Sequence, residues 1–365
     1  MAHSAPEARP SAHWQTGPEL GRVLKAWVFI AATLLALGLP ACEAAPAPKT
    51  SRLVGGAAPI RVVVTIPPLR GLVEPLLTDS RLPHELTTLV PPGASEHGFE
   101  ISPDKLGALG KADVVVMAGL GMEPQVEKFL ADHPSASRRV VNIGRALKLE
   151  EDTGHDHDGH DHGADGHAHD HDDPDHHHAA DPHTWLDPVL AKVAMTAVVA
   201  ALRPGLSEQQ WNALIDARGG LSARITEVQN RYEAALGAAP RRTIVVAHDA
   251  YGYLAKRYNL EVIAITGLNA GEPRPGDLKR AADAVREHSL TTIFVEPQLP
   301  SGAAERLAAA TGAKVAILDP LGDGDWFKLM DANLAALKDA LGVKDLDPAD
   351  RASTPASSAP EKKPR

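Results

Sequence analysis

The sequence contains one cysteine, Cys42, among its 365 residues. This excludes an intramolecular disulfide and a metal site built on several cysteine thiolates. Positive charge is also scarce: 37 Lys and Arg stand against 47 Asp and Glu, which gives a formal net charge of −10. Because nucleic-acid-binding proteins present a basic surface, we expect no nucleic-acid partner. Two enzyme motifs are missing as well, the nucleotide-binding GxxxxGK[ST] loop and the metalloprotease HExxH helix.

An apolar run at 26–41 is 16 residues long, which is short for a membrane span and typical of a signal-peptide core. Arg22 and Lys25 precede this run and Cys42 follows it, so we predict a signal peptide over 1–42. The residues LPAC resemble a bacterial lipobox, whose cysteine is lipidated and attaches the exported protein to a membrane. Cleavage a few residues later and an uncleaved anchor are the alternatives. Each of them places the rest of the chain in the periplasm or another extracytoplasmic space.

Histidine is abundant, and ten of the 18 histidines lie between positions 155 and 178, interleaved with aspartate. This tract offers almost nothing apolar to bury, so we predict a disordered loop over 150–180. Imidazoles and carboxylates bind divalent metals, so the loop is expected to be an accessory, weak metal-binding segment. A charged linker without a role is the alternative. The histidines of this tract are His155, His157, His160, His162, His167, His169, His171, His176, His177 and His178.

Strand and helix patterns alternate on both sides of this tract. They predict an α/β fold with two four-stranded parallel-sheet lobes joined by a long rigid helix. The expected strands are 60–66, 86–90, 113–117 and 139–143, then 243–247, 261–265, 291–295 and 314–318. The expected divisions are a flexible tether (43–58), an N-terminal lobe (59–187), connecting helices (188–238), a C-terminal lobe (239–345) and a disordered tail (346–365).

The connecting helix is expected to begin after Ser207, where SEQQ resembles a capping box. Apolar residues from Trp211 to Leu236 then recur with the helical period. Gly219 and Gly220 interrupt this pattern at a cost of about 1 kcal/mol each relative to alanine. We therefore expect a kink or break at this pair.

Ligands of open parallel sheets bind beyond the carboxyl ends of the strands, and polar side chains follow several of the expected strands. Any one histidine in such a place is more typically a surface residue. Three histidines and a carboxylate from separate loops, however, form a coordination set that suits zinc. Asp181 and Asp187, on either side of His183, are interpreted as turn and helix-cap residues. The candidate metal-site residues are His97, His183, His248, Asp319, Glu96 and Glu296.

Five motifs in this order, GASEHGFEISP, DPHTWLDP, AHDAYGYLAKRY, VEPQ and LDPLGD, resemble those of the periplasmic zinc-binding protein of bacterial zinc ABC importers. The resemblance implies that the zinc ligands are His97, His183 and His248. It places Asp319 at the family's carboxylate position, with Glu96 as its rival or supplement. Glu296 is expected to orient a ligand imidazole through its ring N–H.

The resemblance implies a solute-binding protein that captures Zn²⁺ as the transported ligand and acts as a monomer. Its partners would be a membrane permease and a separate ATPase subunit, because this chain has no P-loop. A manganese-binding member is an alternative, but the manganese branch usually has Glu where this chain has His248. The same residues are also compatible with a zinc hydrolase, or with a metal buffer that binds only through the histidine tract.

Overall fold

The computed structural model describes residues 58–149 and 180–344. The predicted signal peptide with Cys42, nearly all of the predicted tether, the ten tract histidines and the predicted tail lie outside the described residues. Within the described residues, no helix is both long and apolar enough to cross a membrane.

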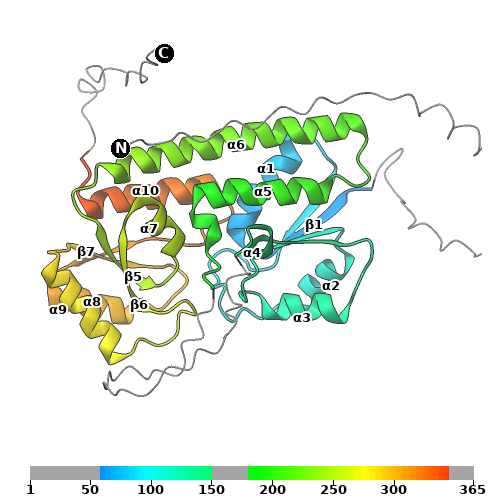
Figure 1. Ribbon diagram of the computed structural model, residues 1–365. Helices are drawn as coiled ribbons and strands as arrows, with labels where there is room; N and C mark the ends of the chain where they lie inside the picture. The colour runs from blue at the N-terminus through cyan, green and yellow to red at the C-terminus, as the bar shows by residue number, and fades with distance from the viewer. Residues whose placement is uncertain (1–57, 150–179, 345–365) are drawn as a thin grey trace, which may run out of the picture. The chain divides into compact units, whose positions relative to one another are not determined.

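The N-terminal sheet, which contains β1 (Figure 1), has four parallel strands in the order β2-β1-β3-β4. Its central strand β1 is almost wholly buried, which explains its run of β-branched residues. The strands are β1 (Ile60–Val64), β2 (His84–Thr88), β3 (Val114–Met117) and β4 (Arg139–Asn142). The helices of this half are α1 (Pro67–Asp79), α2 (Pro103–Lys111), α3 (Pro124–Asp132) and α4 (Ile143–Ala146).

The C-terminal sheet repeats this arrangement, with four parallel strands in the order β6-β5-β7-β8. The prediction of an α/β fold with two four-stranded parallel sheets is therefore confirmed. The strands are β5 (Thr243–His248), β6 (Glu261–Thr266), β7 (Thr292–Val295) and β8 (Lys314–Ile317). The helices are α7 (Gly252–Tyr258), α8 (Pro275–Glu287), α9 (Gly302–Thr311) and α10 (Trp326–Leu341).

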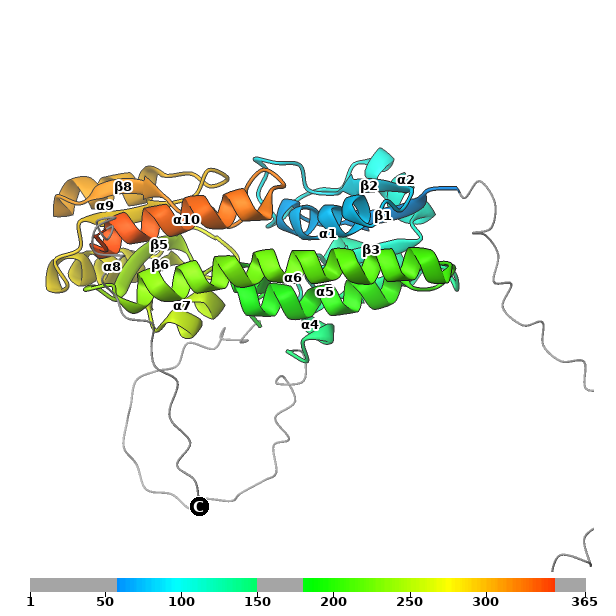
Figure 2. The ribbon, with the colours of Figure 1, turned by 90° about the horizontal axis from the view of Figure 1, so that it is seen from above.

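Between the sheets the chain forms a 3₁₀ turn, η2 (Thr184–Leu186), and two helices, α5 (Pro188–Leu202) and α6 (Glu208–Gly237). Helix α6 packs against α5, against α1 of the N-terminal half and against α10 of the C-terminal half, as Figure 2 shows. It begins with the expected capping box between Ser207 and Gln210.

Of the expected kink or break at Gly219 and Gly220, the break is wrong, because α6 is one continuous helix of 30 residues. Both glycines are exposed, while Leu214, Leu221 and Ile225 on either side of them are buried on the packed face. Burial of that apolar face outweighs the low helix propensity of the pair.

Two buried tryptophans join the segment before α5 to the C-terminal half. Trp185 donates a hydrogen bond from Nε1 to the Pro320 carbonyl at 2.7 Å, and Trp326 Nε1 donates to the Trp185 carbonyl at 2.8 Å. Asp187, the N-cap of α5, also forms an ion pair with Arg257 of α7. These contacts hold the loop that contains His183 against the C-terminal half.

Candidate metal site

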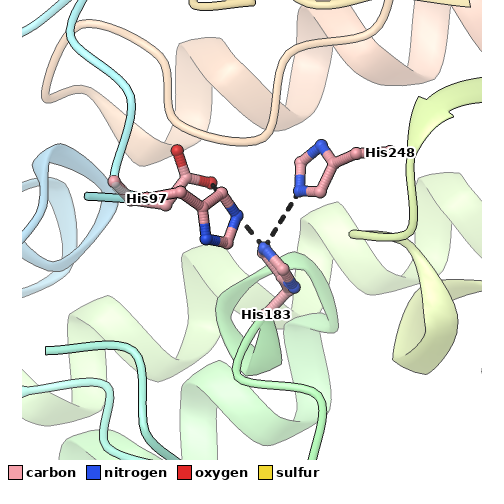
Figure 3. Close-up of side chains that lie close together, drawn as sticks. His97, His183 and His248 are labelled. Carbon is pink, nitrogen blue, oxygen red and sulfur yellow. Dashed lines mark hydrogen bonds and ion pairs between the residues drawn. The ribbon is translucent and has the colours of Figure 1, made fainter. Parts of the chain in front are cut away.

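Four predicted side chains from three separate segments meet at one point. Glu96 and His97 lie in the loop between β2 and α2, His183 immediately precedes η2, and His248 is the last residue of β5. Figure 3 shows the three imidazoles directed toward one another. One ligand atom from each of the four residues lies within 4.8 Å of all the others, which is a separation that a single metal ion can bridge.

The short distances in this group join atoms that bind metals. His248 Nε2 and His183 Nε2 are 3.3 Å apart, and Glu96 Oε1 lies 3.7 Å from His183 Nε2 and 3.7 Å from His97 Nε2. His183 and His248 have no solvent exposure, and Glu96 is 6% exposed. Glu96 Oε1 and His97 Nε2 are buried without a hydrogen-bond partner. Such atoms are costly in a protein interior, and coordination to a cation would satisfy both of them.

Carboxylates hold two of the imidazoles by their other ring nitrogen. His248 Nδ1 lies 2.5 Å from Glu296 Oε1, and His183 Nδ1 lies 2.8 Å from Asp181 Oδ1. In a neutral imidazole, an Nδ1–H that donates to a carboxylate leaves Nε2 unprotonated and free to coordinate. The sequence interpretation gave Asp181 only a turn role. Its position two residues before His183 is the sequence feature that could have indicated the contact with the His183 imidazole.

Burial and neighbouring charges shift the pKa values of the site residues in opposite directions. Burial, reinforced by His248 and His183, lowers the pKa of His97 to about 4. Burial alone would lower the pKa of His183, but Asp181 and Glu96 outweigh it and raise that pKa to about 9. Burial would raise the pKa of Glu96, but His183 and His97 lower it overall. The metal-free site therefore holds an anionic Glu96 beside a protonated His183, whose Nε2 must release its proton before it can bind a divalent cation.

Asp319, the other carboxylate expected in the metal shell, is not part of this group. Its Oδ1 accepts hydrogen bonds from Gln298 Nε2 at 2.8 Å and from the backbone N–H groups of Leu321 and Gly322 at 2.9 and 3.0 Å. Its backbone is held in turn by Asn333 of α10. The carboxylate thus closes the loop after β8, and Glu96 is the carboxylate that lies beside the three histidines.

Two α/β lobes linked by a helix, with one buried site built from both, define the class of metal-specific solute-binding proteins. The chain belongs to the family described as "Zinc-uptake complex component A periplasmic" (ZnuA), whose model matches residues 62–340. The resemblance deduced from the five motifs is therefore confirmed. This is a family of solute-binding proteins.

Relatives of known name agree with this assignment. The chain is 28% identical over 299 residues to the "High-affinity zinc uptake system protein ZnuA" of Bacillus subtilis (strain 168). That alignment covers 78% of this chain and 88% of the relative. It is 26% identical over 323 residues to the "Zinc-binding lipoprotein AdcA" of Streptococcus pneumoniae (strain R6), which covers 85% of this chain. The match spans only 60% of the length of AdcA.

Solved structures share the fold. The crystal structure of ZnuA superimposes with a TM-score of 0.64 at 27% identity and covers 78% of this chain and 99% of that one. A zinc-bound ZnuA that lacks its residues 138–173 gives a TM-score of 0.64 at 27% identity, with coverage of 79% and 100%. The periplasmic zinc-binding protein TroA of Treponema pallidum, at 21% identity and a TM-score of 0.63, shows the same fold.

Proposed function

We propose that this protein captures Zn²⁺ outside the cytoplasm and delivers it to the membrane permease of an ABC importer. The observation that carries the proposal is the convergence of Glu96, His97, His183 and His248, with two of their ligand atoms buried and unpartnered. In this proposal the four side chains bind the ion through one atom each. Family membership and relatives named for zinc uptake support the same conclusion.

The donor set supports zinc over manganese. Three imidazole nitrogens and one carboxylate oxygen match the nitrogen-rich, four-coordinate shells of Zn²⁺, whereas manganese favours more oxygen ligands. Four protein ligands also close the zinc shell and leave no coordination position for a reactive water. A closed shell suits a carrier and argues against a zinc hydrolase.

The proposed partners and the proposed membrane attachment follow from the class of protein. A solute-binding protein needs a permease in the membrane and an ATPase, and this chain carries no P-loop for the ATPase role. The AdcA relative is named a lipoprotein, which supports lipidation of Cys42 as the means of membrane attachment. The histidine tract would act as an accessory collector of zinc, separate from the built site.

The test is native mass spectrometry of a variant that lacks residues 154–178, with Zn²⁺ and Mn²⁺ in competition. We expect one tightly held Zn²⁺ that survives deletion of the tract and is lost on His183→Ala. His288→Ala is the matched control, because His288 is an exposed histidine outside the site. Loss of tight binding together with the tract would establish a metal buffer instead of a carrier. Preferential retention of Mn²⁺ would overturn the choice of metal.

A further inference from the structure

Asp181 makes two hydrogen bonds to the same histidine. Its Oδ1 accepts from the backbone N–H of His183 at 2.9 Å and lies 2.8 Å from His183 Nδ1. One carboxylate oxygen therefore fixes both the backbone and the ring of a proposed ligand. His183 Nε2 consequently faces Glu96 and His248, at 3.7 and 3.3 Å.

The second oxygen of Asp181 lies against the C-terminal half of the protein. Gly252 is the first residue of α7, and a Cβ atom added there would lie 2.8 Å from Asp181 Oδ2. That separation is too short for a real Cβ contact, so a side chain at position 252 would displace the carboxylate. Gly252 is not among the described glycines with positive φ, so its backbone conformation gives no other reason for glycine.

We propose that Asp181 is a positioning residue for His183 and that Gly252, by leaving room for Asp181 Oδ2, sets the geometry of the zinc site from outside it. The inference rests on the proposed zinc capture and deepens it. In this inference Gly252, in the AHDAYGYLAKRY motif of the C-terminal half, controls the position of the ligand His183 in the DPHTWLDP loop. Neither Asp181 nor Gly252 is a ligand itself.

His248 differs from His183 in what holds it. His248 is at the end of a strand and its Nδ1 contacts the buried Glu296, so both its backbone and its ring are supported within the C-terminal half. His183 lies in a loop, and although its ring also packs against Trp185, the carboxylate that Gly252 accommodates is the partner of its Nδ1. Displacement of Asp181 should therefore move His183 Nε2 away from the position where the ion binds.

A double-mutant cycle tests the proposal. Zinc dissociation constants are measured by competition with a chromophoric chelator for wild type, Asp181→Ala, Gly252→Ala and the double variant. Loss of a residue that orients a metal-bound histidine costs about 10–100-fold in affinity, which we expect for Asp181→Ala. Gly252→Ala should weaken binding in the same direction but by less. The double variant should bind no more weakly than Asp181→Ala alone, because the carboxylate that would be displaced is gone.

Two further variants separate positioning from general damage. Asp181→Asn keeps an oxygen that can accept both hydrogen bonds, so it should retain much more affinity than Asp181→Ala. Gly276→Ala is the matched control for Gly252→Ala, because Gly276 lies in the first turn of α8 and an added Cβ meets nothing within 4 Å. The absorption bands of bound Co²⁺ should shift in Asp181→Ala and Gly252→Ala but not in Gly276→Ala.

Effects of Asp181→Ala and Gly252→Ala that multiply in the double variant would overturn the inference, as would wild-type zinc affinity in Asp181→Ala. Either result leaves zinc capture by the wild-type protein intact. Failure of the wild-type protein to bind zinc would overturn the proposed function, and the inference with it.

Discussion

Glu96 and Asp319 are the two carboxylates predicted as alternatives for the fourth position of the metal shell. Glu96 Oε1 is buried without a hydrogen-bond partner, whereas Asp319 Oδ1 accepts three hydrogen bonds. We expect Glu96→Gln to weaken zinc binding by at least about tenfold, because loss of even an outer partner of a metal ligand costs about 10–100-fold. Asp319→Asn should leave the zinc affinity near that of the wild type.

Chelator competition measures both affinities, and thermal unfolding of the zinc-free proteins supplies the control. Asp319→Asn should lower stability by about 1 kcal/mol, because it weakens the hydrogen bonds that close the loop after β8. A larger loss of zinc affinity in Asp319→Asn than in Glu96→Gln would restore Asp319 as the ligand.

The role of a residue could be predicted where the residue lies in a sequence motif. It could be predicted less well where the role depends on contacts between distant segments. The sequence indicated His97, His183 and His248 because each lies in its own motif at a strand end or loop. It left Glu96 and Asp319 as rivals, because the choice depends on which carboxylate already has hydrogen-bond donors. The contact between Asp181 and Gly252 joins residues 71 positions apart in the sequence, and no local pattern indicates such a contact.

Within α6, Gly219 and Gly220 are exposed, and an added Cβ at either position meets nothing within 4 Å. Replacement of each by alanine should raise the free energy of unfolding by about 1 kcal/mol, the usual difference in helix propensity. Gly71→Ala is the contrasting control, because its Cβ would lie 2.3 Å from the backbone nitrogen of Trp326. Urea unfolding should show stabilisation for the first two variants and destabilisation for the third. Unchanged or lower stability in Gly219→Ala would mean that the pair has a structural role in α6.

The segment that connects β3 to α3 contains a buried carboxylate outside the metal site. Glu123 accepts hydrogen bonds from Thr65 Oγ1 at 2.6 Å and from the backbone N–H groups of Ala118 and Gly119 at 2.9 Å each. Burial raises the pKa of Glu123 to about 7, although these three hydrogen bonds act in the opposite direction. The native protein therefore keeps this proton over a pH range in which the unfolded chain has released it.

The free energy of unfolding should consequently fall as the pH rises from about 4.5 to about 7 through this group, by roughly 3 kcal/mol in total. Glutamine does not titrate, so the destabilisation caused by Glu123→Gln should be larger at pH 5 than at pH 8. Urea unfolding of the zinc-free proteins at both pH values measures the difference. Glu227→Gln, at an exposed position on α6, should show no such dependence. Equal destabilisation by Glu123→Gln at pH 5 and pH 8 would show that the native pKa is not raised.

On the scale of the whole molecule, the two sheets share one strand order, and alternating strand and helix patterns predicted both of them. What the sequence could not predict is how segments far apart in the chain pack together. Helix α10 follows the last strand yet packs against α1 near the start of the described chain. The Trp185 and Trp326 hydrogen bonds join the same two halves. The lobe boundaries at 59–187 and 239–345 remain a prediction.

Because the proposed ligands come from both halves, bound zinc should stabilise the molecule as a whole. A ligand present at about 1,000 times its dissociation constant adds about 4 kcal/mol to the free energy of unfolding, provided that it does not bind the unfolded chain. The tract histidines would bind zinc in the unfolded state as well, so the measurement requires the variant that lacks residues 154–178. Calorimetry with and without Zn²⁺ should show one transition whose Tm rises by roughly 8–16 °C, since about 1 kcal/mol shifts Tm by 2–4 °C at this size. His248→Ala should lose most of this rise and His288→Ala should keep it. A rise of equal size in His248→Ala would place the stabilising zinc ion elsewhere in the molecule.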